Sequence, residues 1–118
     1  MTTTYNLEIK QGSDFIDSIT LLNENGSVKD LTGCQAYMQI KDYPWSETSR
    51  ISLSTVNTKL QITALTGVIQ IRLNSVDTAL LVNSFGCYDL LLLEPSGLVS
   101  TVVEGEVRIN RRITEIVL

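Results

Sequence analysis

The sequence predicts an all-β sandwich of about seven to nine strands with one short helix. Short apolar segments alternate with a period of two, turn residues separate them at short intervals, and Ile, Val, Thr, Leu and Ser dominate the composition. The strand–helix–strand spacing that builds a parallel sheet does not appear. Because 118 residues match one ordinary domain, we expect a single sandwich spanning residues 1–118.

The first two strands are predicted over residues 5–10 and 14–22. In the first, alternate residues are apolar and form the inward face. In the second, Asp17 falls on the inward face, which indicates a sheet end or a bulge at that point. Asn25 and Gly26 tolerate the positive φ of a tight hairpin turn, so we expect the chain to reverse there.

The clearest inside–outside alternation spans residues 34–41 and predicts a third strand. Pro44 cannot donate a backbone hydrogen bond to a strand ladder, so residues 42–47 are expected to form a loop. Three further strands are predicted over residues 51–55, 59–63 and 68–73, the last two paired around Thr66 and Gly67.

The C-terminal third is predicted to hold the helix and two longer strands. Ser75 is a candidate N-cap, so a short helix is expected to begin there. Residues 87–94 are apolar on both faces at their centre, which is typical of a central strand covered on both sides. A hairpin turn at 95–97 leads into a long strand over 99–110, with an irregularity expected at Gly105.

The charge distribution argues against a nucleic-acid partner. The formal net charge is −4, whereas nucleic-acid binders carry a clustered positive field. Arg108, Arg111 and Arg112 form a local basic cluster near the C-terminus. The interpretation we favour for them is a solvated strand edge.

Several residues and motifs that are common in enzymes are missing. The sequence has no histidine, which removes the commonest general base and the commonest metal ligand. Gly-rich phosphate loops are absent, and two distant cysteines cannot form a zinc site. The carboxylate pairs Asp14 with Asp17 and Glu104 with Glu106 lie in strand patterns and are expected to face solvent. We therefore predict a protein without catalytic residues, metal, cofactor or small-molecule substrate.

The sequence contains no recognisable leader and no membrane span. The longest apolar run, Leu90–Leu93, is far too short to cross a bilayer. We expect assembly in a reducing cytoplasm, where disulfides are rare, and no association with a membrane. Cys34 and Cys87 are therefore interpreted as small buried apolar residues, although a bridge between them stays open.

Two peripheral segments are candidates for protein contacts. Exposed Tyr and Trp often anchor interfaces, so the loop aromatics either contact a partner or fold back as a lid over the sandwich. The apolar tail 111–118 either docks on a neighbouring subunit or completes its own sheet, and we favour the second interpretation. The candidate interface residues are Tyr43, Trp45, Arg108, Arg111, Arg112, Ile113, Ile116 and Leu118.

Several segments together resemble a family of small structural proteins of tailed bacteriophages. The matching features are a Gln-Gly-x-x-Phe strand, an Asp-Leu-Thr-Gly step into a strand with Met-Gln-Ile, a Gly-x-Tyr-Asp-Leu strand and a closing Glu-Gly-x-Val strand. They stand in this sequence at Gln11–Phe15, Asp30–Lys41, Gly86–Leu90 and Glu104–Val107.

The family resembles the immunoglobulin-like N-terminal domain of baseplate upper proteins and related tail-fibre adaptors. The resemblance implies an immunoglobulin-like antiparallel sandwich in a virion, without enzymatic activity. Its partners would be other virion structural proteins and copies of itself in a symmetric assembly. Domains of this type also serve as head decoration and neck or connector proteins. A carbohydrate- or receptor-binding module is a separate alternative, because Tyr43 and Trp45 could stack on a sugar.

Overall fold

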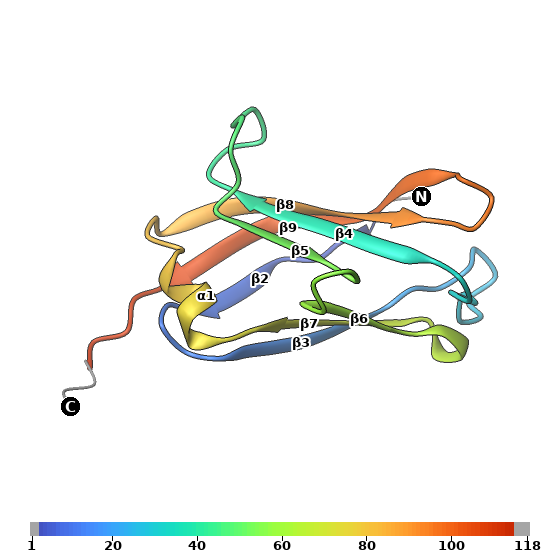
Figure 1. The fold of residues 1–118 in the computed structure, drawn as a ribbon, viewed down its shortest axis with the longest axis horizontal. Coiled ribbons are helices and arrows are strands. Elements are labelled where there is room, and N and C mark those ends of the chain that lie inside the picture. The colour runs from blue at the N-terminus through green and yellow to red at the C-terminus, as the bar shows by residue number, and fades with distance from the viewer. Residues whose placement is uncertain (1–2, 115–118) are drawn as a thin grey trace.

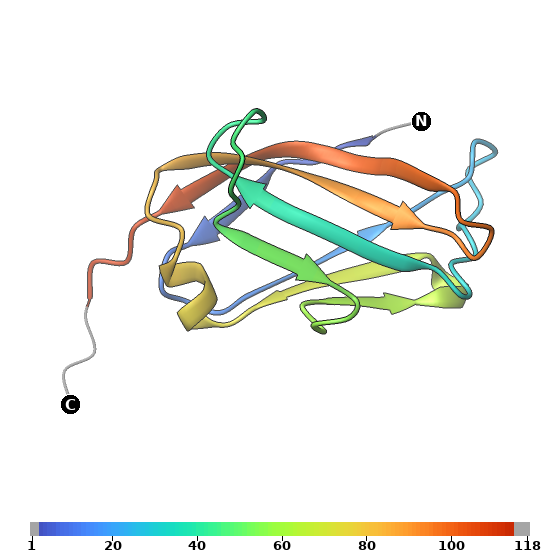
Figure 2. The same cartoon turned by 45° about the horizontal axis from the view of Figure 1, so that its top comes forward.

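The computed structural model describes residues 3–114, which form two β-sheets packed face to face (Figures 1 and 2). This arrangement confirms the predicted all-β sandwich with one short α-helix. The strands are β1 (Thr3–Thr4), β2 (Leu7–Lys10), β3 (Phe15–Thr20), β4 (Gln35–Lys41), β5 (Ile51–Ser54), β6 (Leu60–Thr63), β7 (Val68–Leu73), β8 (Phe85–Leu93) and β9 (Val99–Asn110). The helices are the 3₁₀ turn η1 (Ala64–Thr66) and the α-helix α1 (Ser75–Ala79).

The larger sheet has the order β1-β9-β8-β4-β5, with β2 also paired to β9, and the smaller sheet has the order β3-β7-β6. Crossovers between the two sheets give the strand order of an immunoglobulin-type sandwich. The expectation of a purely antiparallel fold needs a correction, because β1 and β2 run parallel to β9. Parallel pairing joins segments about a hundred residues apart, so no local pattern could reveal it.

The hydrophobic core fills the space between the sheets. The predicted inward faces of the strands contribute its side chains. Among the fully buried residues are Ile9, Ile40, Ile69 and Leu90. The alternation in β4 is confirmed residue by residue, with every second side chain buried. Burial of such side chains stabilises the fold by roughly 1.5–3 kcal/mol each, so the alternating pattern is the main determinant of this architecture.

Two predictions about the long C-terminal strands are corrected by the structure. β8 is central, between β4 and β9, but its outer face is not covered, because Asp89 is exposed and Leu91 is half-buried. The irregularity in β9 lies at Val102, where the register shifts opposite Leu90 and Leu91, and Gly105 pairs regularly with Tyr88.

The turns and the helix follow the predicted positions closely. Gly26 has a φ of 87° within the predicted turn. A hydrogen bond from the Asn23 N–H to the Ser27 carbonyl closes the turn. The N-cap of α1 is Asn74 and not Ser75. The Asn74 side chain accepts from the Asp77 N–H at 2.8 Å, and the Asp77 carboxylate accepts from the Asn74 N–H, which forms a capping box.

The segment between β1 and β2 closes one open side of the sandwich. The Tyr88 hydroxyl donates to the Tyr5 carbonyl oxygen, and the Tyr5 hydroxyl donates to Asp17 Oδ2 at 2.8 Å. The three residues therefore link β8, the N-terminal segment and β3. Asp17 lies on the inward face of β3, as predicted, but in regular register and without a bulge. Its carboxylate is tolerated because β3 is an edge strand.

Candidate interaction site

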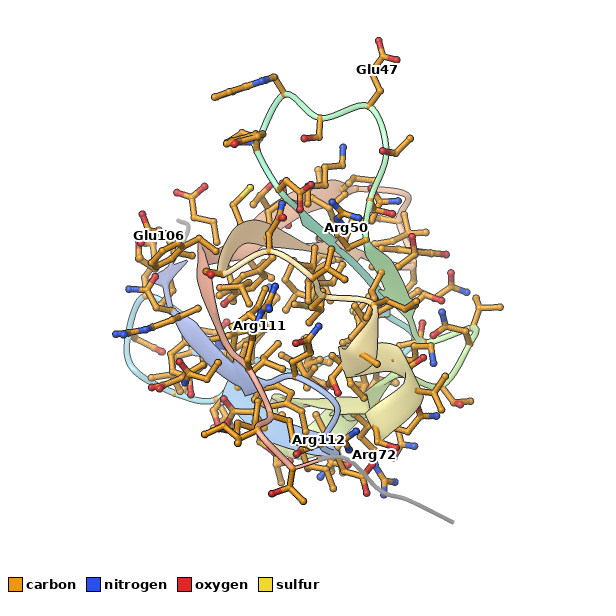
Figure 3. The ribbon with its side chains drawn as sticks, turned by 90° about the vertical axis from the view of Figure 1, so that its left-hand side faces the viewer. Glu47, Arg50, Arg72, Glu106, Arg111 and Arg112 are labelled. Carbon is orange, nitrogen blue, oxygen red and sulfur yellow. The ribbon has the colours of Figure 1, made fainter. Side chains whose placement is uncertain are left out.

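The loop between β4 and β5 projects from the sandwich (Figures 1 and 3). Arg50 closes its base by donating from Nη2 and Nε to the Asp42 carboxylate, at 2.8 Å to Oδ2 and 3.0 Å to Oδ1. Tyr43 and Ser46 form a turn within it, because the Ser46 N–H donates to the Tyr43 carbonyl at 3.0 Å. The loop is thus a braced projection that can present its side chains at fixed positions.

Tyr43 and Trp45 stack on each other on this loop. Their ring centroids are 5.1 Å apart and the rings are nearly parallel, at 7°. Trp45 is 78% exposed and Tyr43 is 56% exposed. The interpretation of Trp45 as a lid over the sandwich is therefore wrong, and the stacked pair presents aromatic surface to solvent.

Asp42 and Arg50, the ion pair at the base of the loop, shift each other's pKa. The hydrogen bonds from Arg50 lower the pKa of Asp42 below its ordinary value, with the guanidinium charge acting in the same direction. The same contact raises the pKa of Arg50. Both groups therefore stay charged over a wider pH range than they would alone.

A groove with a volume of about 590 Å³ lies on the outer face of the larger sheet, beside this loop. Pro44, which stands between the two stacked aromatics in the sequence, forms part of its wall. Its lining includes Lys41, Pro44, Cys87, Asp89, Glu104 and Glu106, and we call it the acidic groove.

Like charges face each other in the acidic groove. Asp89 on β8 is the direct cross-strand neighbour of Glu104 on β9, and Glu106 follows on the same face of β9. Like charges placed opposite each other on one face of a sheet are destabilising. The ion pairs of residues 3–114 are Lys29–Glu94, Arg50–Asp42 and Lys59–Asp77, so none of these three carboxylates belongs to one.

The described part of the C-terminal tail leaves the sandwich where β9 ends, on the left in Figure 1. β9 stops at Asn110, and residues 111–114 join no strand (Figure 1). Arg112 donates from Nη1 to the Gly12 carbonyl at 2.8 Å, and Ile113 is 93% exposed. For residues 111–114, the favoured expectation that the tail completes its own sheet is therefore wrong. Ile116 and Leu118 lie outside the described residues.

The three arginines of the predicted basic cluster are all exposed. Arg108 lies on β9, with Glu8 of β2 and Phe85 of β8 as its cross-strand neighbours. It is solvated, as expected, but β9 is not an edge strand there because β2 pairs with it. Arg111 and Arg112 follow the strand. In Figure 3, Arg112 lies at the bottom of the view, whereas Glu47 of the loop lies at the top.

The two cysteines are free and half-buried. Cys34 packs against the core, and the Cys87 thiol donates to the Lys41 carbonyl at 3.6 Å. Burial raises the pKa of both thiols, so they stay protonated and unreactive at neutral pH. The open question of a bridge is thereby answered, and the two residues act as small apolar side chains.

The two carboxylate pairs differ in what they contact. Asp14 accepts from the Ser75 N–H at 2.8 Å, and Asp17 accepts from Tyr5, so both support the fold. Glu104 and Glu106 face solvent, as expected, but sequence reasoning missed that they share a groove with Asp89. The only available signal was the alternation in the two strands, which does not reveal how the strands align.

Within residues 3–114, no group of three or more His, Cys, Asp or Glu side chains is arranged to hold a metal ion. The helices of this part of the chain are all too short to cross a membrane. No protein-family model matches the sequence, and the curated proteins contain no significant match to it.

Proposed function

We propose that this protein is a non-enzymatic structural component of a tailed-phage virion, an adaptor or assembly protein of the baseplate, tail or fibre attachment. The observation that carries the assembly role is the braced loop with its stacked, exposed Tyr43 and Trp45. Aromatic side chains on a preorganised loop lose little conformational entropy on binding, and they are typical anchors of protein interfaces.

The phage assignment depends on the resemblance of the strand motifs. Two of them fit together in three dimensions, which supports treating them as one pattern. Tyr88 of the Gly-x-Tyr-Asp-Leu strand bonds the Tyr5 carbonyl, and Gly105 of the Glu-Gly-x-Val strand lies directly beneath that carbonyl. Partners would be other virion structural proteins and copies of the chain. Head decoration and neck or connector positions remain alternative locations in the particle.

The test is incorporation into particles. A phage that carries this gene should contain the protein in purified virions, detected by mass spectrometry. Trp45→Ala should reduce incorporation at least about tenfold, because loss of an aromatic anchor costs more than about 1.4 kcal/mol. The matched control is Leu65→Ala, which removes an equally exposed apolar side chain at 76% from the opposite end. Absence of the wild-type protein from the particles would disprove the proposal.

The second candidate function is a carbohydrate- or receptor-binding module, and the same aromatic stack favours it. Ring faces of Trp and Tyr supply apolar area on which a sugar can lie. Glycan-array binding that disappears in Trp45→Ala would support this alternative. Binding that survives the substitution, or no binding at all, would count against it.

A further inference from the structure

The acidic groove lacks a cationic partner within the described chain. Its lining contains three carboxylates, from Asp89, Glu104 and Glu106, but a single ammonium, from Lys41. Arg108 follows Glu106 by two residues on the same face, yet the two side chains do not form an ion pair. The Asp89–Glu104 row therefore keeps an unfavourable repulsion that a cation from outside would relieve.

The neighbouring loop contributes Pro44 to the groove wall, whereas the exposed rings of Tyr43 and Trp45 are not part of the lining. Pro44 lines the groove, and the stacked Tyr43 and Trp45 lie on either side of it in the chain. Guanidinium groups bind both carboxylates and the faces of aromatic rings. An arginine-bearing segment fits the neighbouring carboxylates of Asp89 and Glu104 better than a lysine-bearing one, because the planar guanidinium can donate to both at once.

The chain itself carries such a segment directly after β9. Arg111 is exposed, and the next apolar residue, Ile113, is 93% exposed. The bond from Arg112 to the Gly12 carbonyl directs the chain away from its own groove. In Figure 3, Arg112 lies at the bottom of the view, whereas the loop that borders the groove is at the top. A second copy is therefore the natural acceptor.

We propose that the segment beginning at Arg111 docks in the acidic groove of a second copy of this chain, with Arg111 between the carboxylates of Asp89 and Glu104. Each copy carries both the groove and the segment, so two copies can exchange segments about a two-fold axis and form a closed dimer. This contact deepens the proposed assembly role and rests on it. Its test uses the purified chain alone, so its failure would leave the virion experiment unaffected.

The test measures self-association of the full-length chain by sedimentation velocity over concentrations up to about 1 mM. We expect a monomer–dimer equilibrium that weakens as salt is raised, because the contacts are exposed charge pairs. The double substitution Asp89→Asn with Glu104→Gln should weaken dimerisation about tenfold, the factor expected from removing two exposed charge contacts. It should also leave thermal stability equal or higher, since it removes a repulsion, so loss of the dimer could not be attributed to unfolding.

Glu24→Gln is the matched control, because Glu24 is an exposed carboxylate in the turn at the opposite end. It should leave dimerisation unchanged. Arg111→Glu should abolish the dimer, and its combination with Glu104→Arg should restore it. A chain that stays monomeric throughout, association that grows without stopping at a dimer, or a dimer insensitive to the groove substitutions would each overturn the proposal.

Discussion

At the scale of single residues, position 105 must be a glycine because another backbone segment passes close to it. A Cβ added there would collide with the carbonyl oxygen of Tyr5, and it would also lie 3.0 Å from Asn6 Oδ1. Asn6 Oδ1 accepts from the N–H of Glu106 at 3.0 Å, so the N-terminal segment cannot move outward without losing bonds. Glycine is required at this position because the chain crosses over it.

We predict that Gly105→Ala destabilises the fold by about 1–3 kcal/mol, the range for overpacking. Tyr88→Phe should cost about 1 kcal/mol, because one hydrogen bond is lost. Both substitutions act through the Tyr5 carbonyl, so together they should cost less than their sum. The measurement is urea unfolding. Tyr37→Phe is the control, because the Tyr37 hydroxyl bonds only the exposed Gln35 side chain, and strict additivity would contradict the shared mechanism.

Asp17 shows what residue patterns can and cannot predict. The alternation in residues 14–22 correctly predicted that this carboxylate lies on the inward face of its strand, which is an unfavourable position for a charge. Two features make the position tolerable: β3 is an edge strand, and the Tyr5 hydroxyl donates to the carboxylate across the open side of the sandwich. Tyr5 was itself expected to point inward and is 38% exposed. A contact between two edge segments depends on the packing of the sheets, which no local pattern encodes.

At the scale of elements, the loop between β4 and β5 is stabilised by a single charged contact at its base. Asp42 and Arg50 connect the end of β4 to the start of β5 at 2.8 Å. The folded loop lowers the pKa of Asp42, so the contribution of this ion pair is present above the ordinary carboxyl range and is lost as the pH falls through the lowered pKa.

Acidification should therefore release the loop before the sandwich unfolds. Trp45 is the only tryptophan in the chain, so its fluorescence reports on this loop alone. We predict a fluorescence transition at a pH below about 4, the ordinary carboxyl range, without loss of the β-sheet circular dichroism signal. Asp42→Asn should lack this transition. If fluorescence and circular dichroism change together in the wild type, the loop is not an independent unit.

The edge of the larger sheet at β5 is closed by a side chain. Asn57 donates from Nδ2 to the Ser52 carbonyl at 3.0 Å, and its Oδ1 accepts from the Ser54 N–H at 3.0 Å. These backbone groups would otherwise be open to an incoming strand. Strand addition by a partner at β5 is therefore disfavoured, so we expect a partner to bind through side chains, such as those of the loop between β4 and β5.

Most strands were predictable because their signal is local. The alternation in residues 35–41 and 68–73 depends only on neighbours along the chain, and both segments form strands with the expected buried faces. The acidic groove was not predictable, because it depends on Asp89 lying opposite Glu104. That alignment is set by the hairpin turn and by the bulge at Val102, and the sequence pattern misplaced the irregularity by three residues, at Gly105.

At the scale of the whole molecule, the part of the tail that the structure describes beyond Arg112, residues 113 and 114, is exposed and joins no strand. β9 ends at Asn110, Arg112 makes the last hydrogen bond described, and Ile113 has almost no contact with the sandwich. Removal of residues 113–118 should therefore change the free energy of unfolding by less than about 0.5 kcal/mol. Chemical denaturation measures this directly. A larger loss would mean that the tail stabilises its own domain, and removal of residues 109–118, which cuts into β9, is the destabilising comparison.

The parallel pairing of β2 with β9 also determines when this protein can fold. Residues 7–10 find their partners at residues 107–110, so the larger sheet stays incomplete until residues 107–110 have left the ribosome. Such long-range pairing slows folding, and incomplete sheets expose strand edges that favour aggregation. Folding of the larger sheet therefore requires synthesis of β9, and a product that terminates before β9 will lack a stable core and be open to proteolysis.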